Sequence, residues 1–104
     1  MKRFVVAVCL SSLVAAPVLA QEIPAPIKKA RCVACHAVDK KMIGPGYKDV
    51  AAKYKDNAEA PAKLFDKVRN GGAGVWGDIP MTPHGADKIS DEDLKSSIAW
   101  ILSL

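Results

Sequence analysis

Apolar side chains recur at helical spacing along most of this 104-residue chain. The clearest case is residues 60–70, in which Leu64, Phe65 and Val68 fall on one side of a helical period. Gly71 follows this stretch, and glycine commonly ends a helix because it adopts the left-handed conformation without strain. We therefore predict a helix over residues 60–70.

Two shorter helices are predicted nearer to the N-terminus. The first begins near Pro24 or Pro26, since proline is tolerated in a first turn, and runs to about Arg31. The side of this helix that should face inward holds Ile27 and Ala30. A second short helix is predicted over residues 47–54. Its inward side holds Tyr47, Val50, Ala51 and Tyr54.

The C-terminal stretch carries the most complete helix signal. Ser90 is a good N-cap residue, and the acidic run Asp91-Glu92-Asp93 complements the positive end of a helix dipole. One face then remains apolar to the C-terminus, with Leu94, Ile98, Ile101 and Leu102. We predict that this helix packs across the first one, with Trp100 beside the contact.

Two segments between the helices are predicted to be irregular. Gly44-Pro45-Gly46 forms a turn that no helix or strand would run through. Residues 71–85 contain five glycines and two prolines, so they predict a structured loop. A long loop in a small domain is usually functional or disordered, and apolar residues within this one favour a function. No strand pattern or internal repeat is evident, so the fold class is all-α.

The N-terminus has the pattern of a secretory signal peptide. Met1-Lys2-Arg3 is positively charged, residues 4–16 form a 13-residue apolar stretch broken only by two serines, and small residues precede Ala20. This stretch is shorter than the roughly 20 residues that span a membrane, so a retained anchor is the weaker interpretation. We predict cleavage after Ala20, which leaves one domain over residues 21–104.

Composition restricts the function further. Loss of Lys2 and Arg3 with the signal leaves thirteen basic and eleven acidic residues, a net charge of +2 instead of the +4 of the full chain. A concentrated basic stripe with interleaved aromatic residues is missing from the sequence, so nucleic-acid binding is not expected. A domain this small, with six aromatic residues in the whole chain, usually needs a disulfide, a metal or a cofactor to be stable.

The segment Cys32-Val33-Ala34-Cys35-His36 indicates such a cofactor. Each thiol of a Cys-x-x-Cys-His motif can add to one vinyl group of a haem, and the adjacent imidazole can then bind the iron. A zinc site and a thioredoxin-like dithiol are the alternatives for a bare Cys-x-x-Cys. The histidine, the export signal and a suitably placed methionine favour one covalently attached haem c.

Three side chains are candidates for the second axial ligand. Met42 is only six residues past His36 and can scarcely reach the far side of a porphyrin, so we expect it to pack at the haem edge. Met81 lies between Pro80 and Pro83 in a frame that reduces the entropy lost on ligation. His84 is close enough to compete, although bis-histidine ligation would leave that frame unused.

Further segments strengthen this interpretation. Besides the motif, the spacing of Lys41–Pro45, Tyr47–Lys53, Asn70–Gly71, Gly74–Gly77 and Ile79–Met81 resembles that of the small class I bacterial cytochromes c, which serve respiratory and denitrifying chains. The likeness covers essentially the whole chain after the signal. It implies the class I cytochrome c fold, with about four short helices wrapped around one covalently attached haem.

The resemblance also assigns roles to individual residues. It implies covalent haem attachment through Cys32 and Cys35, and axial ligation of the iron by His36 and Met81. Three further residues would form the haem environment. The Pro45 carbonyl would accept a hydrogen bond from the His36 ring, the Trp76 indole would donate to a propionate, and Lys67 would lie near the same propionate.

Three positions depart from the family pattern. His84 stands where close relatives tend to have an asparagine that touches the methionine sulfur. The segment 85–90 looks longer than the pattern, and Ile27 replaces a more usual aromatic residue in the first helix. The first of these departures is expected to alter the iron–sulfur bond.

The sequence thus predicts a soluble periplasmic monohaem cytochrome that shuttles single electrons and is not an enzyme. Its partners would be transient redox proteins, with a nitrite reductase or a terminal oxidase as candidate acceptor, and the protein would be a monomer without stable membrane insertion. Lysines that could steer acidic partners to the haem edge are Lys28, Lys29, Lys40, Lys41 and Lys48. The alternative function is a ligand sensor or peroxidase-like enzyme with a labile sixth ligand.

Overall fold

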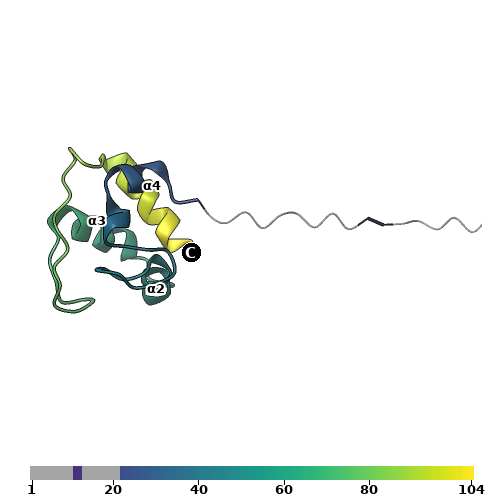
Figure 1. Ribbon diagram of the computed structural model, residues 1–104, viewed down its shortest axis with the longest axis horizontal. Coiled ribbons are helices and arrows are strands. Elements are labelled where there is room, and N and C mark those ends of the chain that lie inside the picture. The colour runs from purple at the N-terminus through teal and green to yellow at the C-terminus, as the bar shows by residue number, and fades with distance from the viewer. Residues whose placement is uncertain (1–10, 13–21) are drawn as a thin grey trace, which may run out of the picture.

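The computed structural model describes residues 11–12 and 22–104, so the predicted signal segment lies almost wholly outside the described residues. The described part contains four α-helices and one 3₁₀-helix (Figure 1). These are α1 (Ala25–Lys29), η1 (Cys32–Ala34), α2 (Tyr47–Lys53), α3 (Ala60–Asn70) and α4 (Asp91–Leu102). Residues 22–104 contain no strand beyond an isolated antiparallel bridge between Gly72 and Met81. The all-α prediction is confirmed.

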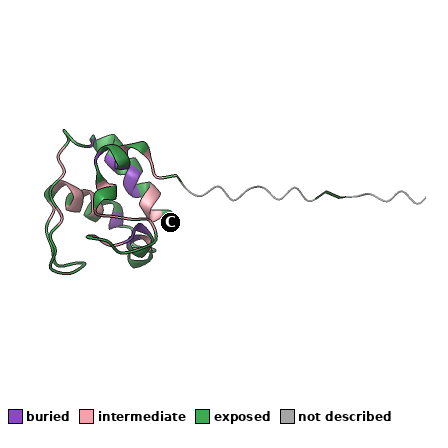
Figure 2. Ribbon diagram, viewed as in Figure 1, coloured by how far each residue is buried: buried purple, intermediate pink, exposed green. Residues whose placement is uncertain are grey.

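The C-terminal helix α4 is the central element of the fold. It contacts α1, α2 and α3, and its inward face carries buried residues that appear purple in Figure 2. Leu94 and Ile98 are each 3% exposed and form a core cluster with Ala30 and Ile89. Leu64, Phe65 and Val68 of α3 pack against this cluster, as the apolar pattern of that helix predicts. Within the described part of the chain, no helix is long and apolar enough to span a bilayer.

Helix α1 turns its apolar side inward as predicted, but it ends two residues earlier than expected. Ile27 is 1% exposed and Ala30 is 6% exposed. Arg31 does not extend the helix, because its backbone is left-handed with φ of 63°. This reversal lets η1 begin directly at Cys32.

The observed bounds of helices α2 and α3 agree closely with those predicted from the sequence. Helix α2 ends at Lys53, one residue before the predicted end, and buries Tyr47 and Val50. Helix α3 has the predicted bounds, and Gly71, with φ of 66°, terminates it. The left-handed backbone at this position explains why a glycine stands there.

The start of α4 agrees with the prediction, whereas the burial of Ile89 in the segment before it was not predicted. The Ser90 hydroxyl accepts a hydrogen bond from the Asp93 backbone N–H, which is the expected N-cap. Ile89, in the segment 85–90 that looked too long, is 5% exposed and belongs to the core. The extra residues form a turn in which the N–H groups of Lys88 and Ile89 donate to the Gly85 carbonyl, and this turn inserts Ile89 into the core.

Candidate functional site

The Cys-x-x-Cys-His motif is folded by its own backbone. Within and after η1, the N–H groups of Cys35 and His36 both donate to the Cys32 carbonyl, at 3.1 and 2.9 Å. Both cysteines are free and half-buried. The turn therefore holds two thiols and an imidazole together within five residues.

The imidazole of His36 is fixed from three sides. Its Nδ1 lies 2.8 Å from the Pro45 carbonyl oxygen, which is the predicted hydrogen bond. Tyr47 stacks on the ring at a centroid distance of 5.2 Å. Gly44 backs the ring so closely that a Cβ at this position would overlap it. Because a carbonyl can only accept, Nδ1 carries a proton, and in the neutral imidazole Nε2 then keeps a free lone pair.

An apolar cavity brings the predicted ligands together. Cys32 and His36 of the motif and Met81 of the loop after α3 all line it. The remaining lining residues are Ile27, Tyr47, Val68, His84, Ile89, Leu94, Ser97, Ile98 and Ile101. Cys35 is not among the lining residues, although its backbone belongs to the same turn. The Ser97 hydroxyl is buried and finds no hydrogen-bond partner within the described part of the chain.

Burial also changes the acidity of two neighbouring groups in this cavity. Burial raises the pKa of the Cys32 thiol above its ordinary value, and a hydrogen bond with Tyr47 opposes this only in part. Burial likewise raises the pKa of the Tyr47 phenol, and the adjacent Cys32 sulfur adds to the effect. Both groups are therefore neutral at physiological pH.

Met81 is held by the end of α3. Its backbone N–H and carbonyl form a bridge with Gly72, at 2.9 and 3.0 Å. Gly71 lies against the Met81 carbonyl, and a Cβ there would overlap it. We call residues 79–85, which carry Met81 and His84 past the cavity, the distal strap.

Arg69 anchors the far end of the distal strap, and sequence reasoning missed it. Its guanidinium donates to the His84 carbonyl at 3.1 Å and to the Ile89 carbonyl at 2.8 Å. It also pairs with Asp91 at 2.6 Å, so it joins α3, the strap and the start of α4. A basic residue in a helix gives no local signal of such contacts, because the partners lie 15 to 22 residues further along the chain.

Several other residues singled out from the sequence do not line the cavity. Trp76 is 41% exposed, and the Lys53 ammonium lies 5.3 Å from its ring centroid. Lys67 is half-buried in α3, with its amine near Gly72. Met42 is 43% exposed and does not line the cavity. Trp100 contacts Tyr47 of α2 edge-on, at 6.1 Å.

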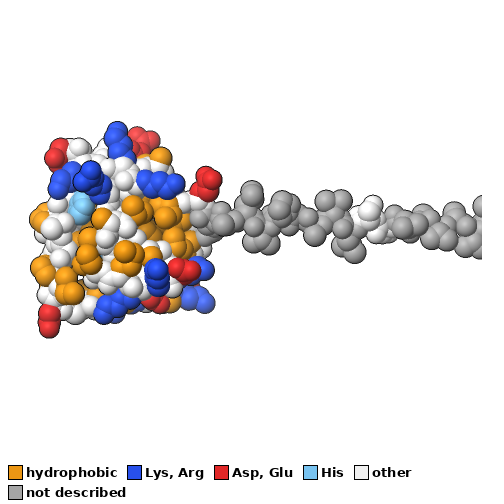
Figure 3. Space-filling model, in the orientation of Figure 1, with side chains coloured by type: hydrophobic (Ala, Val, Ile, Leu, Met, Phe, Trp, Pro, Cys, Tyr) orange, Lys and Arg blue, Asp and Glu red, His pale blue; other side chains and the backbone are white. Residues whose placement is uncertain are grey.

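The surface combines apolar and charged regions. Hydrophobic side chains fill the middle of the face in Figure 3, and most of the charged side chains lie around them. All five candidate steering lysines are exposed. Large apolar side chains that are also exposed are Val33, Met42, Ile43, Val75, Trp76 and Ile79.

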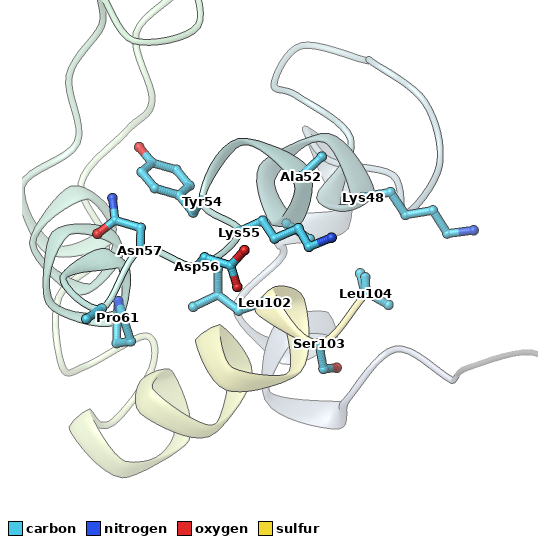
Figure 4. A pocket seen from close by; sticks show the side chains of 12 residues that line it. Lys48, Ala52, Tyr54, Lys55, Asp56, Asn57, Pro61, Leu102, Ser103 and Leu104 are labelled. Carbon is cyan, nitrogen blue, oxygen red and sulfur yellow. The ribbon is translucent and has the colours of Figure 1, made fainter.

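A second hollow lies away from the predicted ligands. Residues at the end of α2, the start of α3 and the C-terminus line it, including Lys48, Lys55, Pro61 and Leu104 (Figure 4). None of the predicted cofactor residues contributes to it.

Comparison with known proteins gives one consistent result. The family described as Cytochrome c matches residues 25–104. The chain is 50% identical over 76 residues to cytochrome c-551 of Pseudomonas aeruginosa, which covers 73% of this chain and 70% of that protein. It is 48% identical over 77 residues to cytochrome c-552 of Nitrosomonas europaea, and this match covers 74% of this chain and 73% of that protein. The crystal structure of wild-type N. europaea cytochrome c552 superimposes with a TM-score of 0.70, at 47% identity, over 76% of this chain and 95% of that chain.

Proposed function

This chain belongs to the cytochrome c family, and we propose that within it the protein is a periplasmic single-electron carrier with one haem. Its cofactor is haem c, and Cys32 and Cys35 fit the attachment motif. Bound haem supplies the chemistry, a reversible change of iron between the ferrous and ferric states. Attachment of the haem, ligation of its iron and contact with partners are assigned to side chains of this protein.

The donor set fits the cofactor. In our proposal Cys32 and Cys35 would form the two thioethers, and His36 and Met81 would bind the iron. The observation that carries the proposal is that Cys32, His36 and Met81 line one apolar cavity although 45 positions separate the last two. The free Nε2 of His36 supports it, since Nδ1 is already committed to the Pro45 carbonyl.

The surroundings favour electron transfer over catalysis. A thioether ligand and an apolar pocket both favour the less charged ferrous state, which raises the reduction potential. With His36 and Met81 both as its ligands, the iron would offer no free position to a substrate. We assign Trp76 and Lys67, both outside the cavity lining, to the propionate side of the haem.

Location and partners follow from the predicted signal and the charged surface. Cleavage after Ala20 would release residues 21–104 into the periplasm. A small, short-lived contact at the haem edge suits a carrier that must release its partner quickly. The exposed lysines at 28, 29, 40, 41 and 48 would attract acidic partners, with a nitrite reductase or a terminal oxidase as candidate acceptor.

The optical spectrum of the purified protein in both redox states tests the function. The oxidised form should show the weak long-wavelength band of iron bound to a methionine sulfur, and a Met81→Ala variant should lose it. A Met42→Ala variant is the matched control and should keep the band. Rapid binding of carbon monoxide or cyanide to the native protein would instead favour a sensor or peroxidase-like enzyme, and a colourless protein would overturn the proposal.

A further inference from the structure

The cavity contains a second histidine. His84 lines the same apolar cavity as His36 and Met81, and these are the chain's only two histidines. His84 is three residues from Met81 on the distal strap and is half-buried. The proposed function assigns it no role.

In both histidines the Nδ1 atom is hydrogen-bonded to a backbone carbonyl. The Nδ1 atom of His84 lies 2.8 Å from the Thr82 carbonyl oxygen, the same distance as that between Nδ1 of His36 and the Pro45 carbonyl. A carbonyl accepts and cannot donate, so Nδ1 of His84 carries the proton. In the neutral imidazole, therefore, the lone pair is on Nε2, which is the arrangement in which an imidazole binds a metal through that atom.

The backbone of His84 is anchored independently of Met81. Its N–H donates to the Val68 carbonyl at 2.8 Å, and its carbonyl accepts from Arg69 at 3.1 Å. The backbone of Met81 is held instead by Gly72. Loss of the Met81 thioether therefore leaves the anchors of His84 intact.

We propose that His84 is a reserve axial ligand, whose Nε2 binds the haem iron when the Met81 sulfur leaves it. This inference rests on the proposed function. In the exchange an iron–sulfur bond breaks and an iron–nitrogen bond forms, without transfer of an electron or a proton. The iron remains six-coordinate, so small molecules still find no open position. Because imidazole favours ferric iron more than a thioether does, the reduction potential falls.

Four holoproteins test the proposal, namely wild type, Met81→Leu, His84→Asn and the double variant. Leucine keeps the bulk of methionine but cannot bind iron, and the haem stays attached through the cysteines. Met81→Leu should lose the long-wavelength band yet give the low-spin electron paramagnetic resonance spectrum of bis-imidazole iron. The double variant should be high-spin, whereas His84→Asn alone should keep the long-wavelength band.

Azide binding gives a second readout. If His84 occupies the iron in nine-tenths of Met81→Leu molecules, azide should bind that variant about tenfold more weakly than the double variant, because only the open fraction is competent. Met81→Ala serves in the same comparison if the leucine variant accumulates poorly. Equal azide affinity in the two proteins would refute the reserve role.

The outcomes separate this inference from the function on which it rests. A wild type without haem, or a Met81→Leu protein with the wild-type spectrum, overturns the proposed function and this inference with it. A normal wild-type spectrum with high-spin Met81→Leu overturns the inference alone. The same holds if a low-spin spectrum of Met81→Leu persists after His84→Asn is added.

Discussion

Arg69 should contribute more to stability than any other charged side chain described above. An Arg69→Met variant keeps a long apolar side chain but loses the hydrogen bonds to the His84 and Ile89 carbonyls and the ion pair with Asp91. The Arg69 side chain is only 16% exposed, whereas that of Asp91 is 70% exposed. The two carbonyl contacts should therefore account for most of the loss.

The expected magnitude follows from these contacts. A hydrogen bond from a charged donor contributes about 1.5–3 kcal/mol. Both carbonyls lie in partly buried surroundings, and water can replace some of what is lost, so we expect about 3 kcal/mol for the pair. The exposed ion pair adds less than about 1 kcal/mol. A domain of this size with about 5–15 kcal/mol of stability still folds, with a midpoint lower by roughly 12–24 °C.

Denaturant unfolding of the holoproteins measures this loss, and Asp91→Asn is the matched control. Asp91→Asn removes the ion pair and some of the favourable charge at the start of α4, so it should lose no more than about 1 kcal/mol. Arg69→Met should also lose the long-wavelength band at lower denaturant concentration, because the distal strap is released. If the control destabilised the protein as much as Arg69→Met does, or if the latter lost less than about 1 kcal/mol, the argument from the carbonyl contacts would fail.

Three further predictions concern the proximal side and the surface. Gly44→Ala places a Cβ about 2.8 Å from Nδ1 of His36. Thermal unfolding should therefore show a free energy of unfolding lower by about 1–3 kcal/mol, and an unchanged midpoint would contradict the overlap. The raised pKa of the buried Tyr47 means that the unfolded chain loses its phenolic proton first, so the free energy of unfolding should fall as pH rises above about 10. Tyr47→Phe should reduce that fall, as chemical denaturation between pH 8 and 11 would reveal, and an unchanged pH dependence in this variant would contradict the effect of burial. Lys40→Glu with Lys41→Glu should slow electron transfer to an acidic partner at low salt and converge with the wild-type rate at high salt, whereas equal rates at low salt would exclude steering by these lysines.

The sequence predicts those parts of the fold that depend on neighbouring residues. The bounds of α3, the Ser90 cap and the inward side of α1 all follow from local spacing and terminal residues. The hydrogen bond between His36 and Pro45 was also predicted, but only through the resemblance to a family. It could not have been deduced from spacing alone, because a turn of unknown shape separates the two residues.

Several contacts between distant segments could not be predicted from the sequence. Ile89 sits in a short polar segment, and its burial depends on a turn that the sequence pattern does not specify. Arg69 resembles any basic residue of an amphipathic helix until the chain brings three acceptors to it. The early end of α1 depends on the left-handed backbone of Arg31, a conformation that non-glycine residues rarely adopt and that helix propensity does not indicate.

The Cys32–His36 turn is ordered almost entirely by short-range contacts. Its backbone bonds join residues no more than nine positions apart, the longest being that from the Gly44 N–H to the Cys35 carbonyl, and the partner of the His36 ring is also nine residues away. Closing such small loops requires little entropy and no preformed core. The unfolded chain can therefore present both thiols for haem attachment before the rest of the polypeptide has collapsed. The strap side, which depends on the completed end of α3, would assemble afterwards around the attached group.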